Sequence, residues 1–249
     1  MSLQHRLRQP EPLLNFFLLA PNPWTAEWLS AGFCESLTLD LQHGMIEDAH
    51  LLPLVQAIRA GGGIPVARLA WNRPDRIMKA LDLGIELLIC PMIDGPADAA
   101  AFVRAAKYPP LGNRSYGPCR AGFYAEEDYF TTANETASLC FAMIETAGAY
   151  AELEAIAATP GLDGLYVGPY DLSVSNGLQR KADFSDPELL AMIDRVREVA
   201  RSHDLFSGVF TMRAEDARAM ADKGFDLITC GTEDFVFQRG AQDWFAQLD

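Results

Sequence analysis

The chain has 249 residues, of which 49% are hydrophobic, and its formal net charge is −14 at pH 7. This length and apolar content are enough for one large barrel or for two small domains with buried cores. The acidic balance argues against a protein that binds nucleic acid or anionic membranes through basic surface patches.

Eight short apolar runs with the character of strands recur along the chain, at residues 16–19, 36–39, 64–67, 87–89, 140–144, 165–167, 206–210 and 227–229. Helical patterns fall between them, at residues 24–31, 47–59, 74–83, 96–106, 149–157, 187–202, 214–223 and 233–247. Buried parallel strands that alternate with amphipathic helices predict an α/β fold, a single (β/α)8 TIM barrel spanning residues 1–249. An open doubly wound sheet is the weaker alternative.

The first apolar run, LLNFFLLA, follows Arg6 and Arg8 and therefore looks superficially like a signal peptide. It is short, contains Asn15 and leads into a helical pattern, which indicates a buried first strand instead. No run approaches the ~20 apolar residues that a transmembrane helix needs. The five cysteines are scattered and form no C-x-x-C pair, which is typical of free thiols. We expect a soluble, cytoplasmic protein with no membrane or nucleic-acid partner.

Polar side chains follow four of the predicted strands at their carboxyl ends. Asp40 and His43 follow the second strand, Arg68 ends the third, Glu145 follows the fifth and Asp171 follows the sixth. Taken alone, each has a plainer interpretation: a turn former, a loop histidine, a salt-bridge partner or a helix cap. In a parallel barrel, however, these ends share one rim, which is where active sites lie. Their convergence favours a functional site.

Glu145 and Asp171 suggest a particular chemistry. A helical segment separates their strands, and a right-handed crossover between parallel strands brings both acids to the same rim. Two carboxylates, completed by water and substrate oxygens, suit a hard divalent cation. The alternative, that Glu145 caps a helix and Asp171 starts a turn, stays open on pattern alone.

Six segments carry a resemblance to a known family: LDLQHG, PVAR, GIELLICPMID, AAKYPPLGNRSYGP, MIET and GLDGLYVGPYDLS, in this order between about Asn15 and Asp234. Together they resemble the HpcH/HpaI-type aldolases, metal-dependent (class II) pyruvate aldolases of the 4-hydroxy-2-oxoheptanedioate and 2-dehydro-3-deoxyglucarate type. The resemblance implies a TIM barrel of the phosphoenolpyruvate/pyruvate-domain type and a magnesium, manganese or cobalt ion bound by Glu145 and Asp171. It also implies a homo-oligomer, usually a hexamer built as a trimer of dimers, whose last helix at about 232–248 packs on a neighbour.

The implied activity is cleavage or formation of a 4-hydroxy-2-oxo acid, with pyruvate and an aldehyde as the other partners. The metal would act as a Lewis acid on the 2-oxo acid. Arg68 suits the developing enolate oxygen, and His43, oriented by Asp40, suits the general base for the 4-hydroxyl group. Backbone amides of one turn would hold the substrate carboxylate; that turn is Gly168, Pro169, Tyr170 and Asp171. No lysine ends a predicted strand, so Schiff-base chemistry is not expected.

Other functions remain open. A related branch cleaves malyl-CoA or citramalyl-CoA and would need basic residues for the CoA phosphates, for which the candidates are Arg73, Arg76, Arg114 and Arg120. A non-catalytic barrel that serves as a binding module is a third possibility. Gln42 and Met143 stand where many members of the family have glutamate and glutamine, and Met143 removes one polar contact expected near the pyruvate unit. The aldehyde is not assigned. The aromatic C-terminal run FVFQRGAQDWFAQL either closes the barrel's own outer layer or contacts another subunit, and we favour the contact.

Overall fold

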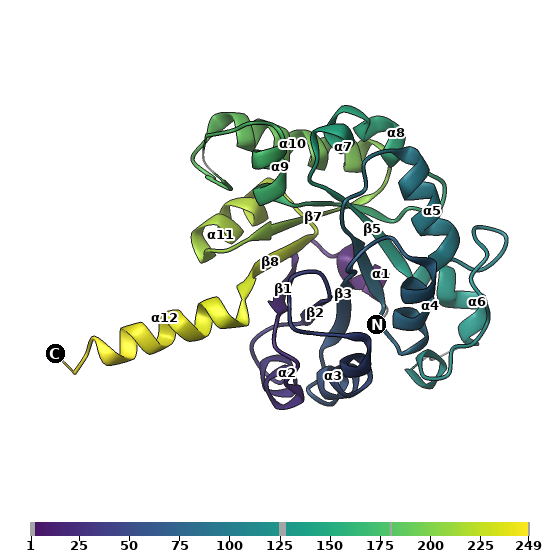
Figure 1. Ribbon diagram of the computed structural model, residues 1–249, viewed down its shortest axis with the longest axis horizontal. Helices are drawn as coiled ribbons and strands as arrows, with labels where there is room; N and C mark the ends of the chain where they lie inside the picture. Colours follow the sequence, from purple (N-terminus) through teal and green to yellow (C-terminus); the bar gives the residue numbers. More distant parts are fainter. Residues whose placement is uncertain (1–2, 125–127, 180, 249) are drawn as a thin grey trace.

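The computed structural model describes residues 3–124, 128–179 and 181–248 (Figure 1). Eight parallel strands form a closed barrel in chain order, and the last strand pairs with the first. The strands are β1 Leu13–Leu18, β2 Ser36–Asp40, β3 Ile64–Arg68, β4 Leu87–Cys90, β5 Leu139–Ile144, β6 Gly164–Val167, β7 Phe206–Thr211 and β8 Leu227–Thr232. The predicted (β/α)8 barrel is therefore confirmed, and the open sheet is excluded.

Helices surround the barrel and connect its strands. They are α1 Leu3–Leu7, α2 Pro23–Ser30, α3 Asp48–Ala60, α4 Pro74–Asp82, α5 Pro96–Ala106, α6 Tyr129–Thr136, α7 Ala147–Ala151, α8 Leu153–Ala157, α9 Pro169–Ser175, α10 Pro187–Ser202, α11 Ala214–Lys223 and α12 Glu233–Phe245, with a 3-10 turn η1 at Ala121–Tyr124. The single helix predicted at 149–157 is two short helices, α7 and α8. In the described ranges, none of these helices is long and apolar enough to cross a membrane.

Local capping explains where several helices begin and end. The Asn22 side chain accepts hydrogen bonds from the backbone N–H groups of Trp24 and Thr25 and so caps α2. Asp186 caps α10 in the same way, directly before a proline that is compatible with the first helical position. At the other end of α11, Gly224 adopts a left-handed conformation with φ 82°, which glycine takes without steric cost.

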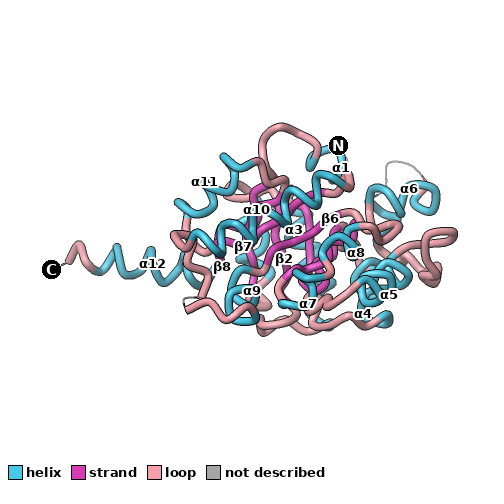
Figure 2. Tube along the Cα trace, turned by 90° about the horizontal axis from the view of Figure 1, so that it is seen from above, coloured by secondary structure: helices cyan, strands magenta, loops and turns pink. Residues whose placement is uncertain are grey.

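Most buried apolar side chains form two layers, one between the sheet and the helices and one inside the barrel, and a smaller cluster surrounds Tyr108 and Tyr129. Leu3 and Leu7 of α1 are buried with the interior layer, so this short helix closes the amino end of the barrel. Figure 2 shows α1 at the opposite end from α7 and α9. The carboxyl ends of the strands are consequently the open mouth of the molecule.

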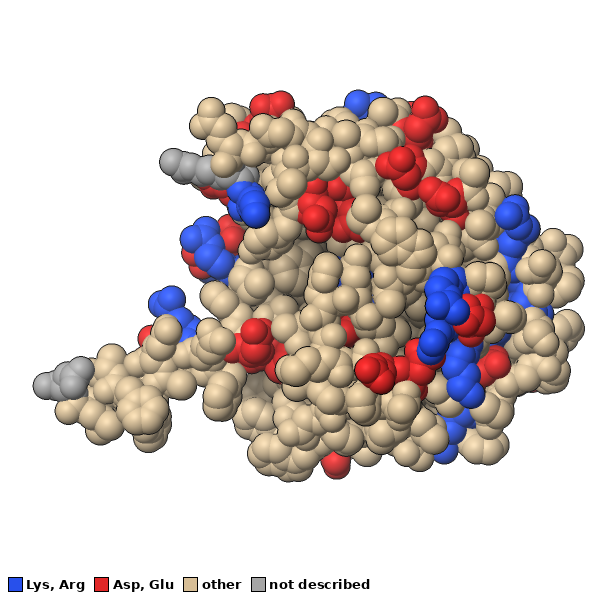
Figure 3. Space-filling view, in the orientation of Figure 1, with Lys and Arg blue, Asp and Glu red and all other residues tan. Residues whose placement is uncertain are grey.

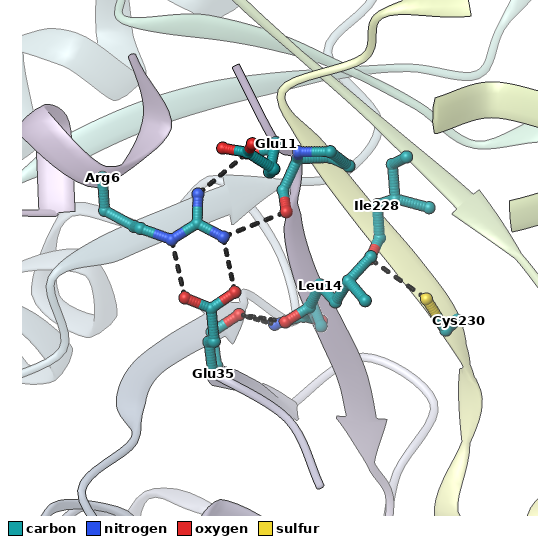
Figure 4. Close-up of polar contacts among 9 residues, drawn as sticks. Arg6, Glu11, Leu14, Glu35, Ile228 and Cys230 are labelled. Carbon is teal, nitrogen blue, oxygen red and sulfur yellow. Dashed lines mark hydrogen bonds and ion pairs between the residues drawn. The ribbon is translucent and has the colours of Figure 1, made fainter. Parts of the chain in front are cut away.

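An ion pair attaches α1 to the barrel (Figure 4). The Arg6 Nε atom lies 2.6 Å from a carboxylate oxygen of Glu35, just before β2. The same guanidinium donates to the backbone oxygens of Glu11 and Pro12, at 2.9 and 3.1 Å. These contacts hold the helix and the segment that leads into β1 in one arrangement.

Helix α12 does not pack on its own barrel. It projects away from the body of the molecule (Figures 1 and 2), and none of its residues is buried. Phe237 and Trp244 are 78% and 70% exposed. The interpretation in which this aromatic run closes the barrel's own outer layer is therefore wrong.

Candidate active site

The structure brings the predicted site residues to the carboxyl end of the barrel. Asp40 and Arg68 are the last residues of β2 and β3 and are register partners in the sheet. Glu145 directly follows β5, and Asp171 lies in the first turn of α9, just after β6. His43 is exposed in the turn after β2. The five predicted residues at the mouth of the barrel are thus one cation, one histidine and three acids.

Asp40 and Arg68 form a buried, two-point ion pair. The Arg68 Nε atom donates to Asp40 Oδ1 at 2.9 Å, and Nη2 donates to Oδ2 at 2.6 Å. The side chain of Asp40 is fully buried and that of Arg68 is 11% exposed. Such planar pairing fixes the direction of a guanidinium as well as its position.

Asp40 contacts His43 differently from the prediction. Its Oδ1 atom accepts hydrogen bonds from the backbone N–H groups of Gln42 and His43, at 3.1 and 3.3 Å. Within the described residues, the His43 imidazole has no hydrogen-bond partner. We therefore correct the role expected for Asp40: it anchors Arg68 and the backbone of the turn, and it leaves the imidazole to solvent or substrate.

Glu145 is a buried carboxylate with a perturbed pKa. It is 1% exposed, and its Oε1 atom accepts a hydrogen bond from the backbone N–H of Met92 at 2.7 Å. Burial raises the pKa of Glu145 to about 7; the Met92 hydrogen bond and the Arg68 charge oppose this rise, and the Asp171 charge adds to it. The Asp171 carboxylate is therefore near enough to disfavour the charged form of Glu145.

Met92 was not identified from the sequence. Its backbone is left-handed, with φ 54°, which costs a residue other than glycine about 1–2 kcal/mol. This conformation presents the N–H group of Met92 to Glu145, 53 residues further along the chain. No side-chain chemistry marks such a residue, so its sequence carries no signal of this contact.

Glu145 and Asp171 suit a divalent cation as donors. Glu145 is buried with a raised pKa, so a bound cation would stabilise its charged form. Asp171 is exposed, and its carboxylate is unpaired within residues 3–124, 128–179 and 181–248. Over the same residues no group of three or more His, Cys, Asp or Glu side chains is placed to hold a metal. Water and substrate oxygens would complete the shell, as is usual for Mg²⁺.

Close packing brings the turn after β6 against Glu145. A Cβ atom at Gly168 would lie 2.8 Å from Glu145 Oε2 and 2.5 Å from the Met143 Cε atom, so a larger residue would displace these side chains. The Gly168 N–H group already donates to the Ile144 oxygen, and Pro169 has no N–H group. Of the four residues predicted to hold a substrate carboxylate through backbone amides, only Tyr170 and Asp171 therefore retain free donors.

Comparison with known proteins identifies the family. Residues 14–239 match the family described as HpcH/HpaI aldolase/citrate lyase. The chain belongs to this family. It is 34% identical to a hydroxypyruvate/pyruvate aldolase of Rhizorhabdus wittichii, over 89% of this chain and 88% of that protein. It is 39% identical to a 2-dehydro-3,6-dideoxy-6-sulfogluconate aldolase of Pseudomonas putida, over 75% and 72% of the two chains.

The fold comparison agrees with the sequence comparison. A crystal structure of an HpcH/HpaI aldolase/citrate lyase family protein from Burkholderia cenocepacia superposes with a TM-score of 0.89, at 30% identity. The match covers 99% of this chain and 98% of the other. The relatives are aldolases by name, so this HpcH/HpaI family member is a carbon–carbon lyase.

The arginines considered for CoA phosphates are engaged within the chain. Arg73 pairs with Asp75 at 2.8 Å, Arg114 pairs with Asp82 at 2.7 Å, and Arg76 pairs with Asp48. Basic and acidic side chains accordingly alternate over α4 in Figure 3. The fourth candidate, Arg120, directly precedes η1 and donates a hydrogen bond to the hydroxyl of Tyr124. In this HpcH/HpaI family chain, each of the four arginines considered for a CoA phosphate therefore already has a partner.

Proposed function

We propose that this chain is a metal-dependent aldolase that cleaves, or forms, a 4-hydroxy-2-oxo acid, with pyruvate and an aldehyde as the other partners. The observation that carries the proposal is the buried Glu145 at the mouth of the barrel, where Asp171 follows the next strand and Asp40 fixes Arg68. The names of the relatives, which include a hydroxypyruvate/pyruvate aldolase, support the same reaction class.

Glu145 and Asp171 would hold the divalent ion, for which magnesium, manganese and cobalt are the candidates. When bound, the ion supplies a Lewis acid for the 2-oxo acid. The free backbone N–H groups of Tyr170 and Asp171 would bind the substrate carboxylate and orient it.

Arg68 would stabilise the oxygen that becomes negative when the carbon–carbon bond breaks. Its Nε and Nη2 atoms are occupied by Asp40, while Nη1 has no partner within the described residues. A donor that is already oriented needs no reorganisation when charge develops, which is the most effective form of electrostatic catalysis. His43, exposed and without a partner on its ring, would accept the proton of the 4-hydroxyl group, directly or through one water.

Pyruvate release from a panel of 4-hydroxy-2-oxo acids tests this proposal. The protein is treated with EDTA, and release is measured with and without added manganese or magnesium. We expect release only when the metal is restored. If the protein releases no pyruvate under any condition but cleaves malyl-CoA or citramalyl-CoA, it is an acyl-CoA lyase instead. No activity on either substrate class would favour a binding module.

We also propose that the chain acts as a single-domain subunit of a cytoplasmic homo-oligomer, with a hexamer as the expected form. The exposed Phe237 and Trp244 of α12 need a partner surface. A second copy offers Trp24, Trp28 and Phe33, which are exposed and packed on one another on and beside α2. The five cysteines are free thiols, as in proteins of reducing compartments.

Sedimentation velocity measures the proposed assembly. Phe237→Asp should shift the protein toward monomer because it places a charge in an apolar contact. Gln238→Asp adds the same charge at the neighbouring exposed position of α12 and serves as the control. A wild-type monomer, or equal effects of the two variants, would contradict the role given to α12.

A further inference from the structure

We propose that Phe17 is a positioning residue for Arg68: its ring, inside the barrel, supports one face of the guanidinium, so that the free Nη1 group is held toward the reacting oxygen. This inference rests on the proposed aldolase function for its catalytic consequence. It stands on geometry that is independent of the metal ligands.

The contact between the two side chains is direct. The Arg68 Cζ atom lies 4.9 Å from the centroid of the Phe17 ring, within the range of a cation–π interaction. The edge of the same guanidinium donates two hydrogen bonds to Asp40, from Nε and Nη2. One face and one edge are thereby fixed, and Nη1 is the part of the group without a described partner.

Phe17 is itself immobilised by its surroundings. It is 1% exposed, stacks on Tyr166 at 6.4 Å between ring centroids, and meets the edge of Phe210 at 5.2 Å. Tyr166 is fixed in turn by a hydrogen bond of 2.6 Å between its hydroxyl and that of Thr229. The support under Arg68 is therefore a packed part of the barrel core, not a mobile side chain.

The same aromatic group reaches the other side of the mouth. The Phe210 ring lies 6.1 Å from the ring of Tyr170, the residue before Asp171. Arg68 and the turn after β6 thus rest on one connected set of rings. This arrangement would keep Arg68, which would donate to the enolate oxygen, at a fixed distance from the turn after β6, which would bind the substrate carboxylate.

The expected consequence falls on turnover more than on substrate binding. Arg68 would act on charge that appears only as the bond breaks, whereas the carboxylate is bound elsewhere, so loosening Arg68 should lower kcat with little change in KM. Loss of a cation–π contact of ordinary strength corresponds to a fall in kcat of about 3- to 30-fold.

Phe17→Leu, compared with Phe141→Leu, tests the inference in the full-length protein with metal present. Phe141 is buried in the same interior layer and stacks on Phe206 at 6.3 Å, whereas the cation–π contact of Arg68 is with Phe17. Both variants should lower Tm, since each removes a core ring. Only Phe17→Leu should lower kcat, by about 3- to 30-fold, with KM changed by less than about twofold. Phe17→Tyr keeps an aromatic ring at this position, so its kcat should stay close to that of wild type.

A stability measurement separates failure of this inference from failure of the proposed function. The Tm shifts of Phe17→Leu and Arg68→Met should be non-additive in the double variant, whereas those of Phe141→Leu and Arg68→Met should add. This result needs no activity, so it holds even for a protein that releases no pyruvate. Additive shifts, equal kcat losses in the two leucine variants, or an equal kcat loss in Phe17→Tyr would each overturn the inference. Phe17→Met provides the same comparison if Phe17→Leu does not fold.

Discussion

Replacing Glu145 by glutamine should make the metal-free protein more stable at alkaline pH and remove its metal-dependent activity. The pKa of this carboxyl is raised from 4.5 to about 7, chiefly by burial. A folded pKa above the unfolded one contributes stability that is fully present below about pH 4.5 and is lost as the pH rises through 7. At pH 8 the loss amounts to about 3 kcal/mol, from about 2.5 pKa units at 1.36 kcal/mol each.

Glutamine does not titrate and so avoids this loss. Its side-chain oxygen can still accept the hydrogen bond from the Met92 N–H group, which Glu145 accepts at 2.7 Å. For a chain of this length, about 3 kcal/mol corresponds to a rise in Tm of roughly 6–12 °C. At pH 5 the advantage should shrink to about 1 kcal/mol, because the native carboxyl is then mostly protonated.

Thermal unfolding followed by circular dichroism in EDTA, from pH 5 to pH 8, measures the effect. Glu135→Gln changes an exposed carboxylate on α6 and should leave the pH dependence as in wild type. Added manganese should raise the Tm of wild type and not that of Glu145→Gln. The reasoning would be refuted if Glu145→Gln were less stable than wild type at pH 8, or if it kept normal turnover.

Three further changes probe the parts of the site separately. Arg68→Lys keeps the charge but loses the two-point pairing with Asp40, so kcat should fall about 100-fold; steady-state kinetics with unchanged turnover would contradict the role of Arg68. Gly168→Ala should raise the metal concentration needed for half-maximal activity by about 10-fold or more, because its Cβ meets Glu145 Oε2, and a metal titration checks this. Met92→Gly should stabilise the protein by about 1 kcal/mol in urea unfolding while keeping the N–H contact; destabilisation would show that the Met92 side chain matters more than its strained backbone.

The fold was predictable from the sequence because its strands are continuous apolar runs. Each predicted strand overlaps an observed one, from the run at 16–19 to the run at 227–229. The helices that were missed, α1, α6 and α9, have five to eight residues, too few turns for a periodic pattern to emerge.

The site was predictable only in part. Barrel topology alone places Arg68 and Glu145 at one rim, since residues that follow parallel strands share an end. The partners of these residues were not readable, because Met92 contacts Glu145 through its backbone and Phe17 contacts Arg68 from a strand far away in the chain. Contacts of this kind depend on how strands that are far apart in the sequence pack together, which no local pattern encodes.

The closure of the amino end by α1 has a kinetic consequence. With Leu3 and Leu7 buried in the interior layer and Arg6 paired with Glu35, α1 covers the amino end of the barrel, so substrates would reach the proposed site from the carboxyl ends of the strands. Reactants would then enter, and products leave, by the same route. The 2-oxo acid would sit deepest, against Glu145, so the aldehyde has to leave first and arrive last. We expect an ordered mechanism in which pyruvate competes with the 4-hydroxy-2-oxo acid and the aldehyde inhibits noncompetitively.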